Sequence, residues 1–153
     1  LNKSIEVNLR IPALIPEDYL PDVHTRLIMY KRISSSLDED ELQDLQVEMI
    51  DRFGLLPETL KLLFRLTRLK LKAEFLGIRK IDGNVSGGRI EFISQTQVDP
   101  MSLVQLIQDE PLHYKLSGAN QLQFKHSSED ASDKLDFIAE LLDKFKLLDQ
   151  QAA

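Results

Sequence analysis

The pattern of hydrophobic and polar positions is clearest between residues 36 and 77, where it predicts two helices joined by a turn. In the first half of this stretch, apolar residues recur three and four positions apart, which places them on one face of a helix. They are Leu42, Leu45, Met49 and Phe53. From Leu60 to Leu76, apolar residues cover most of the helical circumference, so we expect the chain to pack around this second helix. The stretch is therefore predicted to be a central αα-hairpin.

Polar residues, glycine and proline mark the ends of these helices. Two pairs of residues can form the reciprocal hydrogen bonds of a capping box at the start of the first helix. These pairs are Ser36 with Glu39 and Asp38 with Glu41, and the sequence does not choose between them. Gly54 stands where a residue of positive φ ends a helix, and Pro57 stands where the next helix opens.

Two elements are predicted before the hairpin. Apolar and polar residues alternate from Ile5 to Ile11, which is typical of a half-buried strand. Three prolines then interrupt regular structure, and an amphipathic helix is predicted from Asp22 to about Ser34. Its apolar face is expected to consist of Val23, Leu27, Tyr30 and Ile33.

After Gly77 the period changes to that of strands, and two β-hairpins are predicted. The first covers residues 78–94, with Gly83–Gly88 as a flexible loop. The second covers residues 112–125. A short helix separates them, for which Asp99 is the predicted N-cap.

A C-terminal helix is predicted over residues 130–149, because an apolar stripe of helical spacing runs through this stretch. The stripe consists of Leu135, Ile138, Leu142, Phe145 and Leu148. Helices come first along the chain and hairpins follow, which is typical of an α+β fold.

Length and composition limit the class of protein. A chain of 153 residues with 42% hydrophobic residues is expected to form a single domain over residues 1–153, with frayed ends at 1–4 and 150–153. It runs directly from Leu1 into a predicted strand, so we expect it to be part of a larger protein. No apolar run approaches the ~20 residues that a membrane-spanning helix needs. The absence of cysteine suits a reducing compartment, and we expect a cytoplasmic location without membrane contact.

No group of residues forms a recognisable catalytic site. Gly87 and Gly88 are not followed by the lysine or the helix start that a phosphate-binding loop requires. His24, His113 and His126 are far apart and do not have metal-ligand spacing. We therefore expect no enzymatic activity, no metal or other cofactor and no small-molecule substrate.

Acidic residues are concentrated in the first helix of the hairpin and basic residues in the second. At about 100° per residue, one flank of the first helix carries Glu41, Asp44, Glu48, Asp51 and Arg52. Arg52 follows Glu48 by four residues and adjoins Asp51, so it is expected to hold both carboxylates in one orientation. Two interpretations stay open. The acids complement the helix dipole and pair with the neighbouring helix, or they bind a partner that presents arginines.

A second candidate surface is basic and would contact the phosphates of a nucleic acid. It consists of Arg65, Arg68, Arg79 and Arg89. No aromatic residues alternate with these arginines as stacking platforms for bases would require. The net charge of −6 means that the chain as a whole repels nucleic acid. Solvated or internally paired charge is the alternative interpretation.

Five motifs follow one another in a specific order. They are Ile11-Pro12-Ala13-Leu14-Ile15-Pro16, then Asp18-Tyr19-Leu20-Pro21-Asp22-Val23, then Arg26 with Tyr30-Lys31-Arg32-Ile33, then Glu48-Met49-Ile50-Asp51-Arg52-Phe53-Gly54-Leu55-Leu56-Pro57, then Gly77-Ile78-Arg79-Lys80. Together they resemble the C-terminal domain of bacterial transcription-repair coupling factors from Ile5 to about Phe92. From Gln95 onwards, the resemblance is one of length and periodicity.

The resemblance implies a regulatory domain of a DNA-repair protein. In that family, the domain docks on the N-terminal UvrB-like module of the same protein and masks the surface that recruits UvrA. It also restrains an ATP-driven DNA translocase until stalled RNA polymerase is engaged, at the start of nucleotide excision repair. The docking face includes a Glu-x-x-Asp-Arg motif, which matches Glu48, Asp51 and Arg52. The alternative is an accessory domain that contacts nucleic acid through the four arginines.

Overall fold

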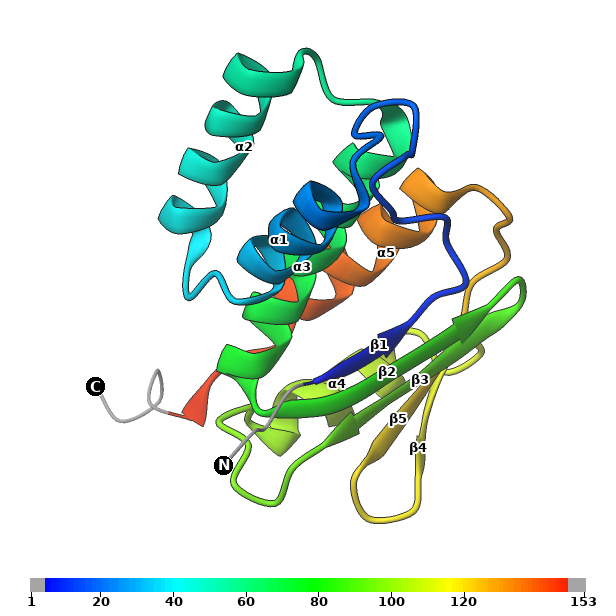
Figure 1. The fold of residues 1–153 in the computed structure, drawn as a ribbon. Helices are drawn as coiled ribbons and strands as arrows, with labels where there is room; N and C mark the ends of the chain where they lie inside the picture. The colour runs from blue at the N-terminus through cyan, green and yellow to red at the C-terminus, as the bar shows by residue number, and fades with distance from the viewer. Residues whose placement is uncertain (1–4, 149–153) are drawn as a thin grey trace. The chain divides into compact units, whose positions relative to one another are not determined.

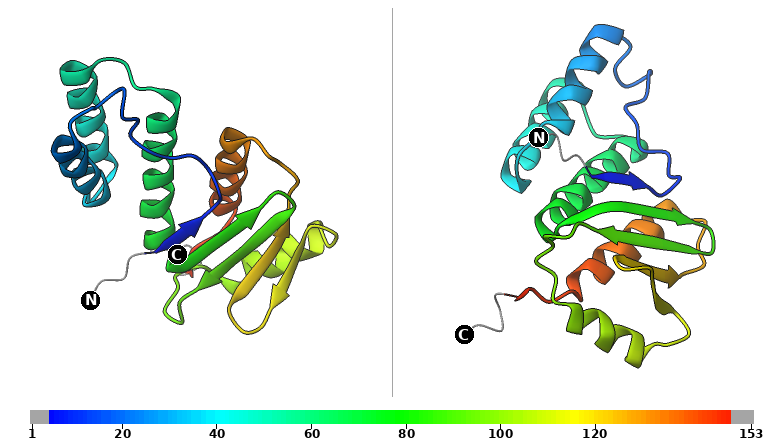
Figure 2. Two further views of the ribbon diagram at one scale, coloured as in Figure 1. Left: turned by 45° about the vertical axis from the view of Figure 1, so that its right-hand side comes forward. Right: turned by 90° about the horizontal axis from the view of Figure 1, so that it is seen from below.

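The computed structural model describes residues 5–148, which belong to two compact units (Figures 1 and 2). Of the described residues, unit 1 contains 5–10 and 72–148, and unit 2 contains 11–71. The ends that the sequence predicts to fray lie outside the described residues. That residues 1–153 form a single domain stays a prediction.

Unit 2 holds the three-helix region that the sequence predicts. Its helices are α1 (Val23–Ser34), α2 (Glu39–Phe53) and α3 (Glu58–Leu76), of which the last continues beyond residue 71 into unit 1. Side chains from all three helices and from the segment before α1 form one buried cluster. It contains Ile15, Leu20, Met29, Ile33, Leu42, Leu45, Met49, Leu56, Leu60 and Phe64. Phe64 is completely buried, as expected if α3 is the helix around which the unit packs.

The structure selects one of the two capping options at the start of α2. Oδ1 of Asp38 accepts a hydrogen bond from the N–H of Glu41 at 2.8 Å, so Asp38 is the N-cap. The carboxylate of Glu41 accepts in return from the N–H of Leu37 at 2.6 Å. Gly54 ends the helix at a φ of 100°, a positive value that favours glycine.

The predicted apolar face of α1 is confirmed at Tyr30 and Ile33, which pack in or against the buried cluster, and is wrong at Val23 and Leu27. Val23 and Leu27 are 59% and 61% exposed, whereas Met29 and Ile33 are buried. Apolar residues occupy more than one face of this helix, so the local pattern allows two orientations. Packing against the cluster of unit 2 selects the face that carries Met29 and Ile33.

Unit 1 is built on a five-stranded mixed sheet. Its strands are β1 (Glu6–Asn8), β2 (Ile78–Asn84), β3 (Gly87–Phe92), β4 (Tyr114–Ser117) and β5 (Gln121–Lys125), and their order is β1-β2-β3-β5-β4. The two predicted hairpins are confirmed, and antiparallel pairing of β3 with β5 joins them into one sheet. The predicted N-terminal strand is only three residues long and pairs in parallel with β2.

Two helices lie on one face of this sheet, α4 (Pro100–Asp109) and α5 (Ala131–Asp143) (Figure 2). Asp99 caps α4 as predicted, because its Oδ1 accepts from the N–H of Met101 at 3.0 Å. The inward side chains Ile81, Ile90 and Leu122 are completely buried. They pair in register across β2, β3 and β5 and so share one face, and the residues next to them in each strand belong to the opposite face.

The segment Gly83–Gly88 is not the flexible loop that the sequence predicts. Strands β2 and β3 extend into it and leave only Val85 and Ser86 between them. A Cβ atom on Gly88 would lie 2.0 Å from the carbonyl oxygen of Asp82, and one on Gly87 would lie 2.2 Å from that of Phe124. These glycines therefore serve the close approach of neighbouring strands rather than a flexible connection.

The C-terminal helix is shorter than predicted and ends at Asp143. Phe145 is buried beyond its end. The chain then runs beside residues 97–99, where Lys146 accepts from the N–H of Asp99 at 2.7 Å and Leu148 donates to Gln97 at 2.8 Å. A longer helix would lose these hydrogen bonds, although the apolar stripe continues.

Candidate functional site

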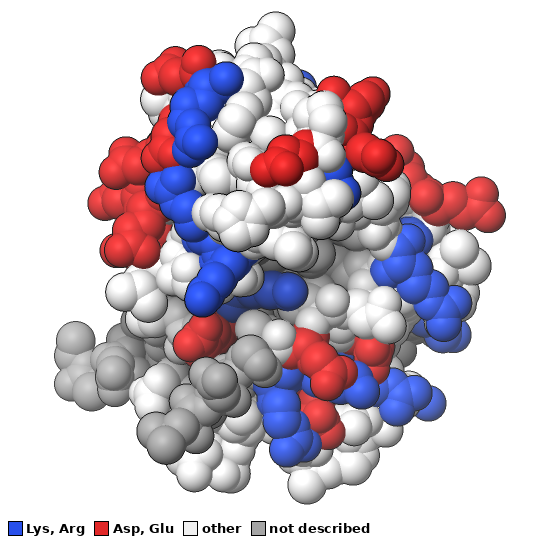
Figure 3. All heavy atoms as spheres, in the orientation of Figure 1, with Lys and Arg blue, Asp and Glu red and all other residues white. Residues whose placement is uncertain are grey.

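The acidic flank of α2 is the surface to which the sequence assigns docking. Figure 3 shows acidic side chains gathered over α2 at the left of the view, beside a band of Lys and Arg. Three acids, Glu39, Asp40 and Glu41, lie in the first turn of the helix, where they complement its dipole. Further along α2, Glu48 is the acidic residue of this flank that binds arginines.

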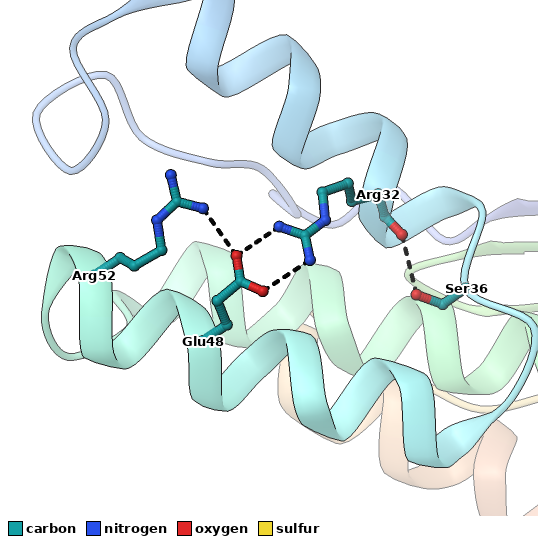
Figure 4. Close-up of polar contacts among 4 residues, drawn as sticks. All are labelled: Arg32, Ser36, Glu48 and Arg52. Carbon is teal, nitrogen blue, oxygen red and sulfur yellow. Dashed lines mark hydrogen bonds and ion pairs between the residues drawn. The ribbon is translucent and has the colours of Figure 1, made fainter.

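The carboxylate of Glu48 is held by two arginines (Figure 4). Arg32, in the last turn of α1, donates from Nη1 to Oε2 at 2.6 Å and from Nη2 to Oε1 at 2.8 Å. Arg52, one turn after Glu48 on α2, donates from Nη1 to Oε2 at 2.8 Å. The paired arrangement with Arg32 fixes the plane of the carboxylate as well as its position.

These hydrogen bonds keep Glu48 ionised. The donors of Arg32, and secondly those of Arg52, stabilise the carboxylate and lower the pKa of Glu48 from 4.5 to about 2. The same contact with Glu48 raises the pKa of Arg32. All three side chains remain open to water, since 36% of Glu48, 44% of Arg32 and 49% of Arg52 is exposed.

Arg52 also contacts the aromatic ring of Phe53, which in turn packs against Tyr19. Its guanidinium lies 4.7 Å from the centre of the Phe53 ring, within the range of a cation–π contact. Phe53 meets the ring of Tyr19 edge-on at 6.2 Å, and the hydroxyl of Tyr19 donates to the carbonyl of Gly54 at 2.8 Å. The end of α2 and the orientation of Arg52 are therefore fixed together.

Asp51 differs from Glu48, although both belong to the same motif. It is exposed, and its side chain has no hydrogen bond or ion pair among residues 5–148. The expectation that Arg52 holds both carboxylates is therefore wrong, because adjacent side chains on a helix do not face each other. Asp44 is likewise exposed and without such a partner in the described part of the chain, whereas Glu41 is engaged at the start of α2.

Sequence reasoning missed Arg32, which contributes two of the three hydrogen bonds to Glu48. It lies in one of the motifs that carry the family resemblance, but no local spacing connects it with α2. The expected pairing of α2 with the second helix of the hairpin does occur elsewhere. Nε of Arg68 on α3 donates to Glu39 at 2.6 Å.

The four arginines of the alternative nucleic-acid surface are divided between the two units. Arg65 and Arg68 belong to unit 2, while Arg79 and Arg89 belong to unit 1. Arg68 pairs with Glu39, and Arg79 pairs with Glu91 at 3.0 Å. Arg89 is exposed and has no acidic partner among residues 5–148.

Within residues 5–148, no group of three or more His, Asp or Glu side chains is arranged to hold a metal ion. No helix in that range has the length and hydropathy needed to cross a membrane.

Comparison with known proteins identifies the family. A family model of the TRCF domain matches residues 9–103, which include α1, α2 and the Glu48 network. The chain belongs to the transcription-repair coupling factor family. It is 43% identical over 141 residues to the transcription-repair-coupling factor of Escherichia coli, and 44% identical over 140 residues to that of Haemophilus influenzae. Each alignment covers 92% of this chain and 12% of the relative, so the chain spans about an eighth of their length.

A crystal structure of the C-terminal domain of a transcription-repair coupling factor has the same fold. The TM-score is 0.78 at 20% identity, and the match covers 92% of this chain and 91% of that one. The α+β fold and the resemblance found in the sequence are therefore confirmed.

Proposed function

We propose that this chain is a non-catalytic regulatory domain that keeps a transcription-repair coupling factor autoinhibited. It docks on the N-terminal UvrB-like module of the same protein and masks the surface that recruits UvrA. By docking, it also restrains an ATP-dependent DNA translocase until stalled RNA polymerase is engaged. The parent protein then acts in transcription-coupled nucleotide excision repair in the bacterial cytoplasm.

The observation that carries this proposal is the contrast between Glu48 and Asp51. A carboxylate has about four acceptor positions, and Arg32 and Arg52 occupy three of those on Glu48. Asp51 is exposed and has none of its positions filled from residues 5–148. Asp51 therefore supplies the carboxylate for an arginine of the module, and Glu48 holds Arg52 in place to receive a carboxylate from it.

The docking contact has to be weak enough for the domain to separate from the module when polymerase is engaged. Truncating one partner of a charge pair that loses water on docking costs about 2–5 kcal/mol, and exposed pairs cost less. Because the module and the domain are in one chain, their effective concentration is high and a weak contact is enough to hold them together. Polymerase opens the contact because it binds the open form of the protein more tightly than the closed form. The difference between these two affinities sets how far the equilibrium shifts.

The test is calorimetric titration of this domain with the UvrB-like module as a separate chain. Asp51→Ala is expected to weaken binding about 30-fold, which corresponds to about 2 kcal/mol. Its unfolding temperature should stay unchanged, because Asp51 has no contact to lose in the described part of the chain. Glu48→Ala is expected to weaken binding as well and to lower stability, since it releases Arg32 and Arg52.

Glu140→Ala is the matched control, because it changes the net charge equally from an exposed position on α5. It should bind like the unmodified domain. The same variants are then placed in the complete parent protein, where Asp51→Ala should increase UvrA binding and basal ATPase activity. If Asp51→Ala and Glu140→Ala behave alike in both assays, the acidic flank is not the docking surface.

A further inference from the structure

The open face of the sheet in unit 1 carries a groove that the docking proposal does not use. Figures 1 and 2 show α4 and α5 on one face of the sheet. On the other face, an open groove of about 920 Å³ extends over residues of β1, β2, β3, β5 and β4. It is bordered by the turn between β2 and β3 and by the segment between α4 and β4.

Four of the charged side chains that line this groove are Lys or Arg. They are Arg10, Arg89, Lys115 and Lys125. All four are exposed, and none has an acidic partner among residues 5–148. The acidic side chain in the lining, Asp82, lies 3.6 Å from Lys80. The groove is therefore positive in a chain whose net charge is −6.

The polar residues form a row across the sheet. Asn8 pairs in register with Asp82, Asp82 with Arg89, Arg89 with Gln123, and Gln123 with Lys115. Strands lie about 4.8 Å apart, so this row is about 19 Å long. At about 3.4 Å per nucleotide along one strand of DNA, it has the length of five to six nucleotides. In Figure 3, Lys and Arg side chains lie over the sheet at the lower right, interspersed with acidic ones.

Arg10 reaches the groove from a strained backbone conformation. Its φ is 56°, and among the described residues no other non-glycine residue has a positive φ. Such a conformation disfavours residues with a Cβ and persists where the surrounding structure requires it. Leu9, the residue before it, is buried, so the change of backbone direction takes the chain from the core to the edge of the groove.

We propose that this groove binds the sugar–phosphate backbone of a nucleic acid. The face offers side-chain donors of the kinds that contact phosphate, namely Arg, Lys, Asn, Gln and Ser. The inner strands have both neighbours in place, so their main chains do not pair with an added peptide strand. The lining also includes the buried Tyr114 and Phe124 and the exposed Leu112, but these lie outside the polar row that crosses the sheet. The chemistry favours duplex phosphates over an acidic protein segment.

The test is fluorescence anisotropy of a labelled 20-base-pair DNA duplex, titrated with this 153-residue chain at 25 to 200 mM NaCl. With four phosphate contacts, the affinity is expected to fall about 150-fold between 50 and 200 mM salt. The double variant Arg89→Ala/Lys115→Ala should bind more weakly, and its affinity should fall only about 12-fold over that range, as for two contacts.

Lys31→Ala/Lys70→Ala is the matched control. Both lysines lie in unit 2, outside the groove, and have no acidic partner among residues 5–148. This control should keep the salt dependence of the unmodified chain, and Arg89→Lys should retain binding because a phosphate contact needs a positive charge. Asp51→Ala should not weaken DNA binding, which separates this test from that of docking.

Three results would overturn the proposal. One is the absence of duplex binding at 25 mM salt. Another is an equal loss of affinity in the groove variant and the control, which would indicate attraction by the whole surface. The third is displacement of the duplex by polyglutamate at equal charge concentration, which would assign the groove to an acidic protein segment.

Discussion

Glu48 is a surface residue whose side chain has a defined position. Its position depends on three hydrogen bonds from two helices, while about a third of the side chain stays exposed at 36%. Exposed ion pairs contribute little individually. Here the paired contact with Arg32 and the support of Arg52 by Phe53 give the network a defined geometry.

The stability of the chain is expected to respond to acid through Glu48. Its pKa in the folded chain is about 2, below the ordinary value of 4.5. The unfolded chain therefore takes up the proton first, so the stabilising contribution is complete above pH 4.5 and is lost as the pH falls to about 2. Urea denaturation of the unmodified chain and of Glu48→Gln should give a stability difference that shrinks over this window.

Asp51→Asn provides the comparison for this acid response. The side chain of Asp51 forms no hydrogen bond or ion pair among residues 5–148, so this variant removes a carboxylate of the same flank that has no such contact to lose. A difference between Glu48→Gln and the unmodified chain that persists unchanged at pH 2 would contradict the network as the cause.

At the scale of the element, local signals place most helix ends correctly. Asp22, Asp38 and Asp99 are N-caps, and the side chain of each accepts a hydrogen bond from a backbone N–H in the first turn of its helix. Aspartate is a preferred N-cap residue, so these helix starts can be recognised in the sequence. The wrong boundaries have non-local causes. The C-terminal helix stops at Asp143 because the following backbone pairs with residues 97–99, which are more than forty positions earlier.

The close approach of β2 and β3 at Gly88 leads to a prediction for this hairpin. A Cβ at this position would lie 2.0 Å from the oxygen of Asp82 and 2.8 Å from both Cα of Gly83 and Cζ of Phe124. Gly88→Ala is therefore expected to destabilise the chain by about 3 kcal/mol, in the upper range for forced overpacking. Thermal unfolding followed by circular dichroism would measure this.

Gly118→Ala is a suitable control for that substitution. Gly118 has a φ of 65° and no atom within 4 Å of the position of an added Cβ, so only the cost of the backbone conformation remains. That cost is about 1–2 kcal/mol. Equal shifts in unfolding temperature for the two variants would show that crowding between β2 and β3 is not the cause.

At the scale of the whole molecule, the chain builds unit 1 from two separated stretches. Strand β1 pairs with β2 in the register Glu6 to Lys80, and unit 2 occupies the sequence between them. The sequence predicts both strands but not their parallel pairing. Nor does it predict the pairing of β3 with β5, or the contact of Arg32 with Glu48. Such contacts depend on the fold of the intervening chain rather than on a local period.

Leu9 is expected to stabilise the junction of these stretches. It is 4% exposed, and its Cδ2 lies near Gly83 of β2. Leu9→Ala should reduce stability by about 2–4 kcal/mol through lost burial and a cavity. Hydrogen exchange should show faster exchange of the β2 amides. The matched variant Leu14→Ala removes the same atoms from a side chain that is 42% exposed and should cost much less. Equal losses would mean that β1 adds little to unit 1.

The position of β4 at the end of the strand order has a consequence for self-association. An outermost strand presents unpaired N–H and C=O groups, onto which another copy of the chain can add its own strand. β4 has only four residues, and Lys115 lies within it, whereas Leu116 is 51% exposed. A short outer strand with a charged residue opposes such addition. Lys115 therefore opposes the addition of a further strand at this edge of the sheet.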